Sequence, residues 1–126
     1  MSGIGLVPLV ENGFGLTPRL ENKTLTVTFT GNADMSAVRP LSMYLSHVHA
    51  EALELELDEV AFDLKQLYFM NSSCFKSFVT WINSVSTGDK ARVYRIRFLS
   101  NPQQYWQRRS LDALRRMAQD IVTIES

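Results

Sequence analysis

Residues 60–82, "VAFDLKQLYFMNSSCFKSFVTWI", change their hydrophobic pattern at a polar step in the middle. The first five, "VAFDL", form a short apolar run that is typical of a largely buried β-strand. After the polar residues 71–73, "NSS", apolar residues recur at helical spacing, at Phe75, Phe78, Val79, Ile82 and Val85. This spacing predicts a deeply packed amphipathic helix. A strand followed by a polar step and a helix is a repeating unit of α/β domains.

The sequence before this stretch predicts two strands and another helix. Residues 24–31, "TLTVTFTG", alternate apolar residues with threonines, which indicates a half-buried strand. Residues 16–20 are its expected partner across the turn "ENK". Apolar residues at helical spacing from Val38 to Ala52 predict a helix, with Asp34 or Ser36 as a possible cap. The next residues, "ELELDE", fit either a strand or a continuation of this helix.

The sequence after the central stretch predicts a strand, a helix and a last strand. The strand is "RVYRIRFL", residues 92–99; the helix starts at Asn101-Pro102; "DIVTIE" closes the chain. Helical connections between strands imply parallel pairing and right-handed crossovers. The expected fold is a single small α/β domain with a mixed β-sheet, helices packed against it and the order β-β-α-β-α-β-α-β. It would occupy residues 16–126, and the turn signal Asn12-Gly13 predicts an extra arm or hairpin within residues 1–15.

Composition restricts the chemistry further. The 126 residues carry zero net charge and a single cysteine, so an internal disulfide is excluded. No apolar run approaches the roughly 20 residues that span a bilayer. The N-terminus lacks a basic segment and Pro8 breaks its apolar run, unlike a signal peptide. We therefore expect a cytoplasmic protein without membrane association, metal or cofactor.

Charge is unevenly distributed along the chain. Residues 1–87 carry 5 basic and 9 acidic side chains, whereas residues 88–126 carry 8 basic and 4 acidic ones. The basic half could form one patch, with Tyr105 and Trp106 beside Arg95, Arg97, Arg108, Arg109, Arg115 and Arg116. Zero net charge and the lack of a nucleic-acid-reading motif make an anionic protein the better expected partner than DNA or RNA.

Residues 61–82 resemble the signature of the STAS domain, the anti-sigma-factor antagonist family. That signature has two apolar residues, Asp-Leu, two further residues, the pattern apolar-x-Phe-Met/Ile, then Asp-Ser-Ser/Thr-Gly and an apolar helix. The matching residues here are Asp63, Leu64, Leu67, Phe69, Met70, Ser72 and Ser73. Residues 25–38, "LTVTFTGNADMSAV", resemble the family's second strand and its loop, where Gly31 and Asp34 match. The resemblance covers about residues 16–125 and implies a STAS-like fold.

The resemblance also implies a function in bacterial signal transduction. Members have no catalytic machinery; they bind a serine kinase of the GHKL ATPase type, which is also an anti-sigma or switch factor and thereby controls transcription. The kinase phosphorylates the first serine of the signature, and a PP2C-type phosphatase reverses this. The acceptor would be Ser72, with Ser73 as the alternative. The expected partner-binding residues are Asp34, Asn71, Ser72, Ser73, Cys74 and Lys76.

Two departures from the signature leave a second reading open. Asn71 stands where the family has Asp, and Cys74 where it has Gly. The alternative is a STAS-like adaptor or sensor that is not phosphorylated. On physical grounds Asn71, Ser72 and Ser73 are all good helix caps, and a helix start also suits a phosphate. Homo-oligomerisation stays open.

An enzyme is the weakest of the alternatives. A helix start can lower the pKa of a thiol such as Cys74, but the sequence offers no base to accompany it. His47 and His49 are two positions apart, so they diverge on a helix and do not form a metal site. We expect both histidines at the surface or at a helix end, and we expect no catalytic residues.

Overall fold

A six-stranded sheet with three helices forms the protein, in a computed structural model that describes residues 6–88 and 93–126. The strands lie in sequence order across the sheet, from β1 to β6. β1 (Leu9–Glu11), β2 (Phe14–Glu21) and β3 (Thr24–Ala33) are antiparallel. The remaining strands, β4 (Glu59–Met70), β5 (Arg95–Leu99) and β6 (Val122–Glu125), continue the sheet in parallel with β3.

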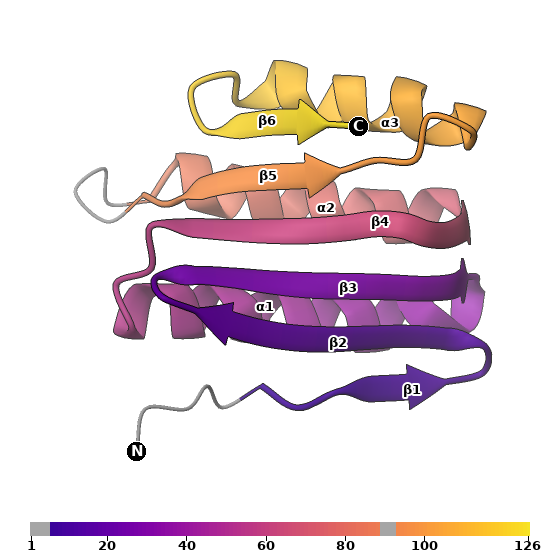
Figure 1. Ribbon diagram of the computed structural model, residues 1–126, viewed down its shortest axis with the longest axis horizontal. Coiled ribbons are helices and arrows are strands. Elements are labelled where there is room, and N and C mark those ends of the chain that lie inside the picture. The colour runs from indigo at the N-terminus through magenta and orange to yellow at the C-terminus, as the bar shows by residue number, and fades with distance from the viewer. Residues whose placement is uncertain (1–5, 89–92) are drawn as a thin grey trace.

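Each parallel pair is joined through a helix. α1 (Val38–Glu54) connects β3 to β4, α2 (Ser72–Ser86) connects β4 to β5, and α3 (Tyr105–Met117) connects β5 to β6. Because the strands advance in one direction, crossovers of one hand place all three helices on the same face of the sheet (Figure 1). The predicted α/β fold with a mixed sheet is confirmed.

The N-terminal hairpin is present and is continuous with the sheet. Asn12 and Gly13 both have positive φ, 52° and 79°, as the tight turn between β1 and β2 requires. β2 begins at Phe14, before the predicted residue 16, and pairs there with Gly31. Gly31 itself has φ of 86°, and a side chain at this position would collide with the carbonyl of Gly13. The match of Gly31 to the family pattern therefore has a local structural reason.

Further predicted boundaries change in the structure. The short strand predicted at residues 60–64 is longer, because β4 continues to Met70. The ambiguous "ELELDE" segment divides, since α1 ends at Glu54 and β4 starts at Glu59. The third helix begins at Tyr105, so its predicted start at Asn101-Pro102 was wrong. The Asn101 carboxamide oxygen accepts a hydrogen bond from the backbone N–H of Gln103 at 2.9 Å. This side-chain turn holds the segment out of the helix.

The core lies between the sheet and the helix layer. Phe29, Phe62 and Phe98 project from neighbouring strands onto Phe78 and Trp81 of α2. Their ring centroids are 5.1–5.8 Å apart, which is the range for favourable aromatic contacts. The opposite face of β3 carries half-buried threonines, as its alternating sequence predicted. No helix within the described residues is long and apolar enough to cross a membrane.

Candidate functional site

The two segments that resemble the STAS family, residues 25–38 and 61–82, meet at the ends of β3 and β4. Ala33 and Met70 are partners in the parallel ladder, and the backbone N–H of Asn71 donates to the carbonyl of Ala33 at 2.9 Å. The loop that contains Asp34 therefore lies against the start of α2, although the hydrogen-bonded residues Asn71 and Ala33 are 38 positions apart in sequence.

Of the three candidate caps Asn71, Ser72 and Ser73, it is Asn71 that caps α2. Its side-chain oxygen accepts a hydrogen bond from the backbone N–H of Cys74 at 2.9 Å, and its own backbone is extended. Ser72 and Ser73 are the first two residues of the helix itself. Ser72 is exposed, whereas Ser73 is half-buried. Neither hydroxyl has a hydrogen-bond partner within the described part of the chain.

Cys74 lies beneath this surface. Its side chain is fully buried, and its Sγ donates to the backbone carbonyl of Asp34 at 3.5 Å. Burial, and secondarily the negative charge of Asp34, raise the pKa of the thiol to about 11. The thiol is therefore protonated at neutral pH, the opposite of what a nucleophile needs. The cysteine at the family's glycine position adds an internal contact and no protrusion.

Asp34 places a fixed negative charge beside the helix start. One of its carboxylate oxygens accepts hydrogen bonds from the hydroxyl of Ser36 at 2.6 Å and from the Ser36 backbone N–H at 2.9 Å. These bonds hold the pKa of the carboxyl below its ordinary value, so Asp34 is ionised at neutral pH. They also cap the short 3-10 turn Met35–Ala37 that leads into α1.

Exposed apolar side chains flank these polar groups. Met35 is 68% exposed and Phe69, in register with Asn32 at the end of β4, is 47% exposed. Lys76 is exposed one helical turn after Ser72. We call the set Asp34, Met35, Phe69, Asn71, Ser72, Ser73 and Lys76 the α2-start surface. Large apolar groups mixed with polar ones at an exposed edge are typical of protein-binding sites.

A buried glutamine, not among the predicted site residues, supports this surface. Gln107 is fully buried, and its Nε2 donates to the carbonyls of Leu64 at 2.7 Å and Leu67 at 3.0 Å. Its Oε1 accepts from the backbone N–H of Asn101 at 2.8 Å. β5 pairs with β4 only as far as Asp63, so Gln107 replaces the missing strand on the segment that leads to Ser72. A polar residue in the apolar stripe of α3, four positions before Leu111, was the available signal.

The histidines have separate environments. His47 is exposed, as expected. His49 is half-buried, and its Nδ1 is hydrogen-bonded to the hydroxyl of the buried Tyr94 at 2.7 Å, so the expectation of a simple surface position was wrong for it. Burial lowers the pKa of His49. Within residues 6–88 and 93–126 no three His, Cys, Asp or Glu side chains gather as a metal site would need.

The arginines of the basic half do not form one patch. Arg97 lies on the open face of the sheet between Glu59 and Glu125, at 3.0 and 3.3 Å. Arg108, Arg109, Arg115 and Arg116 belong to α3, in the helix layer behind the sheet (Figure 1). The six arginines of the predicted patch are therefore divided between two surfaces, and Arg97 on the sheet is ion-paired.

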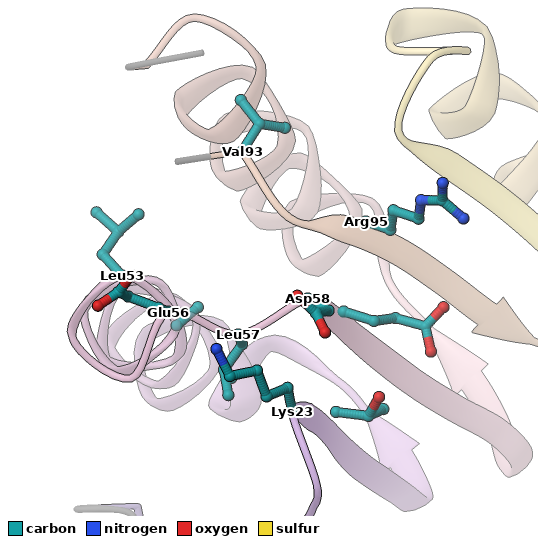
Figure 2. A pocket seen from close by; sticks show the side chains of 10 residues that line it. Lys23, Leu53, Glu56, Leu57, Asp58, Val93 and Arg95 are labelled. Carbon is teal, nitrogen blue, oxygen red and sulfur yellow. The ribbon is translucent and has the colours of Figure 1, made fainter. Parts of the chain in front are cut away.

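A polar hollow lies at the other end of the sheet, far from the α2-start surface. Figure 2 shows it between the end of α1 and the starts of β3, β4 and β5, with Lys23, Asp58 and Arg95 around it. Its charges are mixed, and the carbonyl of Lys23 accepts the backbone N–H of Asp58 at 2.9 Å. None of the predicted site residues lies there.

No protein-family model matches the sequence, and no curated protein matches it. Solved structures of anti-sigma factor antagonists do match the fold. One from Mycobacterium paratuberculosis superposes with a TM-score of 0.65 over 89% of this chain and 85% of its own, at 12% identity.

Two further similar structures are of SpoIIAA. Its unphosphorylated form has a TM-score of 0.56 and 18% identity, covering 90% of this chain and 87% of its own. The phosphorylated form of SpoIIAA, a Bacillus cell fate determinant, has a TM-score of 0.54 and 15% identity, covering 88% and 91%. The chain thus has the STAS fold of the anti-sigma factor antagonists, as the resemblance predicted.

Proposed function

We propose that this protein is a regulatory protein-binding module of the anti-sigma factor antagonist kind, controlled by reversible phosphorylation of Ser72. The observation that carries the proposal is that Ser72 is exposed and does not serve as the helix cap. Its hydroxyl is exposed at the first position of α2, while Asn71 does the capping. A fold shared with a protein that has phosphorylated and unphosphorylated forms supports the same reading.

The geometry supplies a physical switch. The first backbone N–H groups of a helix have no acceptors within the helix, and the helix dipole is positive there. A phosphate on Ser72 would be tolerated by these groups and would add about 1.5 to 2 negative charges at pH 7. The ionised Asp34 makes the same surface still more negative. A partner that contacts Met35 and Phe69 would then face a doubly charged anionic group beside the ionised Asp34 and dissociate.

The partners follow from the kind of module proposed. A GHKL-type serine kinase that also acts as an anti-sigma factor would bind the α2-start surface and phosphorylate Ser72. A PP2C-type phosphatase would restore the unmodified form. Regulation of transcription in the bacterial cytoplasm is the setting in which such a circuit operates, and the domain itself would perform no catalysis.

A phosphorylation assay tests the acceptor. The full chain is incubated with ATP, Mg²⁺ and a GHKL-type kinase from the same genome, and peptides spanning residues 66–82 are analysed by tandem mass spectrometry. We expect one phosphate on Ser72, its loss in Ser72→Ala and its retention in Ser73→Ala. An unmodified peptide with every such kinase, or phosphate only on Ser73, would contradict the proposal.

A second candidate function is partner binding through the α2-start surface without phosphorylation of Ser72. Asn71 and Cys74 differ from the family pattern on either side of the two serines, and this observation favours an adaptor that binds its partner without phosphorylation. For such an adaptor, pull-down would recover a partner through the α2-start surface although the kinase assay leaves Ser72 unmodified. Phe69→Ala would weaken that interaction, since the exposed ring would be a contact.

A further inference from the structure

A groove along α3 has a composition unlike that of the α2-start surface. It runs between the outer side of α3 and the edge strand β6 and has a volume of about 930 Å³. Its lining includes Pro102, Tyr105, Arg108, Arg109, Asp112 and Ile124. We call it the α3 groove. Its size is sufficient for several side chains of a bound peptide.

The charge of the α3 groove is unbalanced. α3 carries four arginines and one aspartate, which leaves the helix positive by three charges. Arg115 and Arg116 share Asp112, each at 2.8 Å from one of its oxygens. Arg108 and Arg109 are exposed and have no carboxylate partner among the residues that the structure describes. Two guanidinium groups, each with several N–H donors, are thus available to an anionic ligand.

Apolar groups lie next to these arginines. Tyr105 is 88% exposed, and Pro102 and Ile124 contribute apolar surface to the groove. A phosphate backbone would gain little from this apolar surface. A peptide in which acidic and apolar side chains alternate would satisfy both kinds of group, because Arg pairs with carboxylates in a bidentate manner and aromatic rings bury apolar side chains.

We propose that the α3 groove is a second docking surface, which binds an acidic, partly apolar segment of a partner protein. It contains none of the α2-start residues, so binding there does not depend on the state of Ser72. A partner held at the α3 groove would remain close while the α2-start surface engages and releases, and tethering of this kind raises the effective concentration for rebinding.

Titration with a defined probe tests the proposal. The probe is a fluorescein-labelled peptide in which glutamate alternates with leucine and phenylalanine, and its control has glutamine at every glutamate position. Binding to the full chain is measured by fluorescence anisotropy, and the bound residues are identified by ¹⁵N chemical-shift changes. We expect shifts in residues 100–116 and 122–126, and affinity for the glutamine peptide at least ~10-fold lower.

Charge reversal gives the matched comparison. The double variant Arg108→Glu/Arg109→Glu should weaken peptide binding at least ~10-fold. Arg39→Glu, which reverses a charge at an exposed position of α1, should leave binding unchanged, as should Ser72→Asp. Tyr105→Ala should weaken binding ~3- to 10-fold by removing the aromatic contact. Circular dichroism checks that each variant is folded.

Four outcomes would overturn the proposal. They are no binding of the acidic peptide, an equal loss in Arg39→Glu, tighter binding of a thymidine oligonucleotide than of the peptide, and self-association that Arg108→Glu/Arg109→Glu abolishes in the ultracentrifuge. The third would assign the groove to nucleic acid and the fourth to a second copy of the chain. Because Ser72→Asp is included, failure here is separable from failure of the phosphorylation switch.

Discussion

Three residues have different roles at the start of α2. Asn71 caps the helix, Ser72 presents a free hydroxyl, and Cys74, two positions later, closes the contact with the Asp34 loop from inside. From the sequence, Asn71, Ser72 and Ser73 are all good candidates for the cap. Because Asn71 is the cap in the structure, a change at the exposed Ser72 would leave the cap intact.

This division predicts unequal effects on stability. Asn71→Ala removes the hydrogen bond to the Cys74 N–H and should lower the free energy of unfolding by about 1 kcal/mol. Ser72→Ala removes only an unbonded hydroxyl and should change it by less than about 0.5 kcal/mol. Urea denaturation of both variants measures the difference. An equal loss in the two variants would mean that Ser72 shares the capping role.

Cys74 should be unreactive in the folded protein. Burial raises the pKa of its thiol to about 11, above its ordinary value, so the folded state favours the protonated form. The corresponding stabilisation is complete at neutral pH and is lost as the pH rises from the ordinary thiol pKa of about 8.5 toward 11. Iodoacetamide at pH 8 should label Cys74 in urea and leave it unlabelled in buffer. Rapid labelling of the native chain would contradict this environment.

At the scale of elements, α3 does more than cover the sheet. Backbone carbonyls in residues 64–68 of β4 accept hydrogen bonds from the side chains of Asn101, Trp106 and Gln107. The backbone N–H of Asn101 in turn donates to the side chain of Gln107. Trp106 Nε1 donates to the carbonyl of Tyr68 at 3.1 Å, and Asn101 Nδ2 to that of Lys65 at 3.1 Å. The strand segment that presents Phe69 and Ser72 is thus held from one side by β3 and from the other by side chains of the α3 region.

Replacing Gln107 should destabilise the segment of β4 whose carbonyls it binds. Gln107→Leu would leave buried carbonyls of β4 and the Asn101 N–H without partners, at a cost of about 2 to 4 kcal/mol in unfolding free energy. It should also speed amide hydrogen exchange in residues 64–70. Gln103→Leu, at an exposed position four residues earlier, is the matched control and should have little effect. Similar stability of the two variants would show that the glutamine is dispensable.

The elements with a clear period could be predicted, and those set by side-chain turns could not. The alternation in residues 24–30 and the apolar stripe of α2 identified β3 and α2 because both are half exposed. The start of α3 was missed because the Asn101 turn competes locally with the helix. A polar residue within the apolar stripe of α3 marks Gln107 as unusual, but its partners Leu64 and Leu67 lie about 40 residues away in sequence, so the pattern does not identify them. The resemblance to the STAS signature implied that Asp34 lies beside the α2 start, and in the structure the Asp34 loop contacts that helix start.

At the scale of the whole molecule, the loops that follow the carboxyl ends of the parallel strands lie at one edge of the sheet. In open α/β sheets, ligands commonly bind beyond those ends. The α2-start surface lies there, after β3 and β4, while the polar hollow of Figure 2 lies at the opposite end. The excess of basic residues in the C-terminal part of the sequence lies largely on α3. Arg108 and Arg109 of this helix are separate from Ser72.

The central claim is that charge at Ser72 controls partner binding. The most direct measurement is isothermal titration calorimetry of a GHKL-type kinase from the same genome with the full chain and with its Ser72→Asp and Ser72→Asn variants, which differ in charge but hardly in size. We predict that Ser72→Asn binds like the unmodified chain and that Ser72→Asp binds at least ~10-fold more weakly. Equal affinity of the two variants for the kinase would contradict the claim.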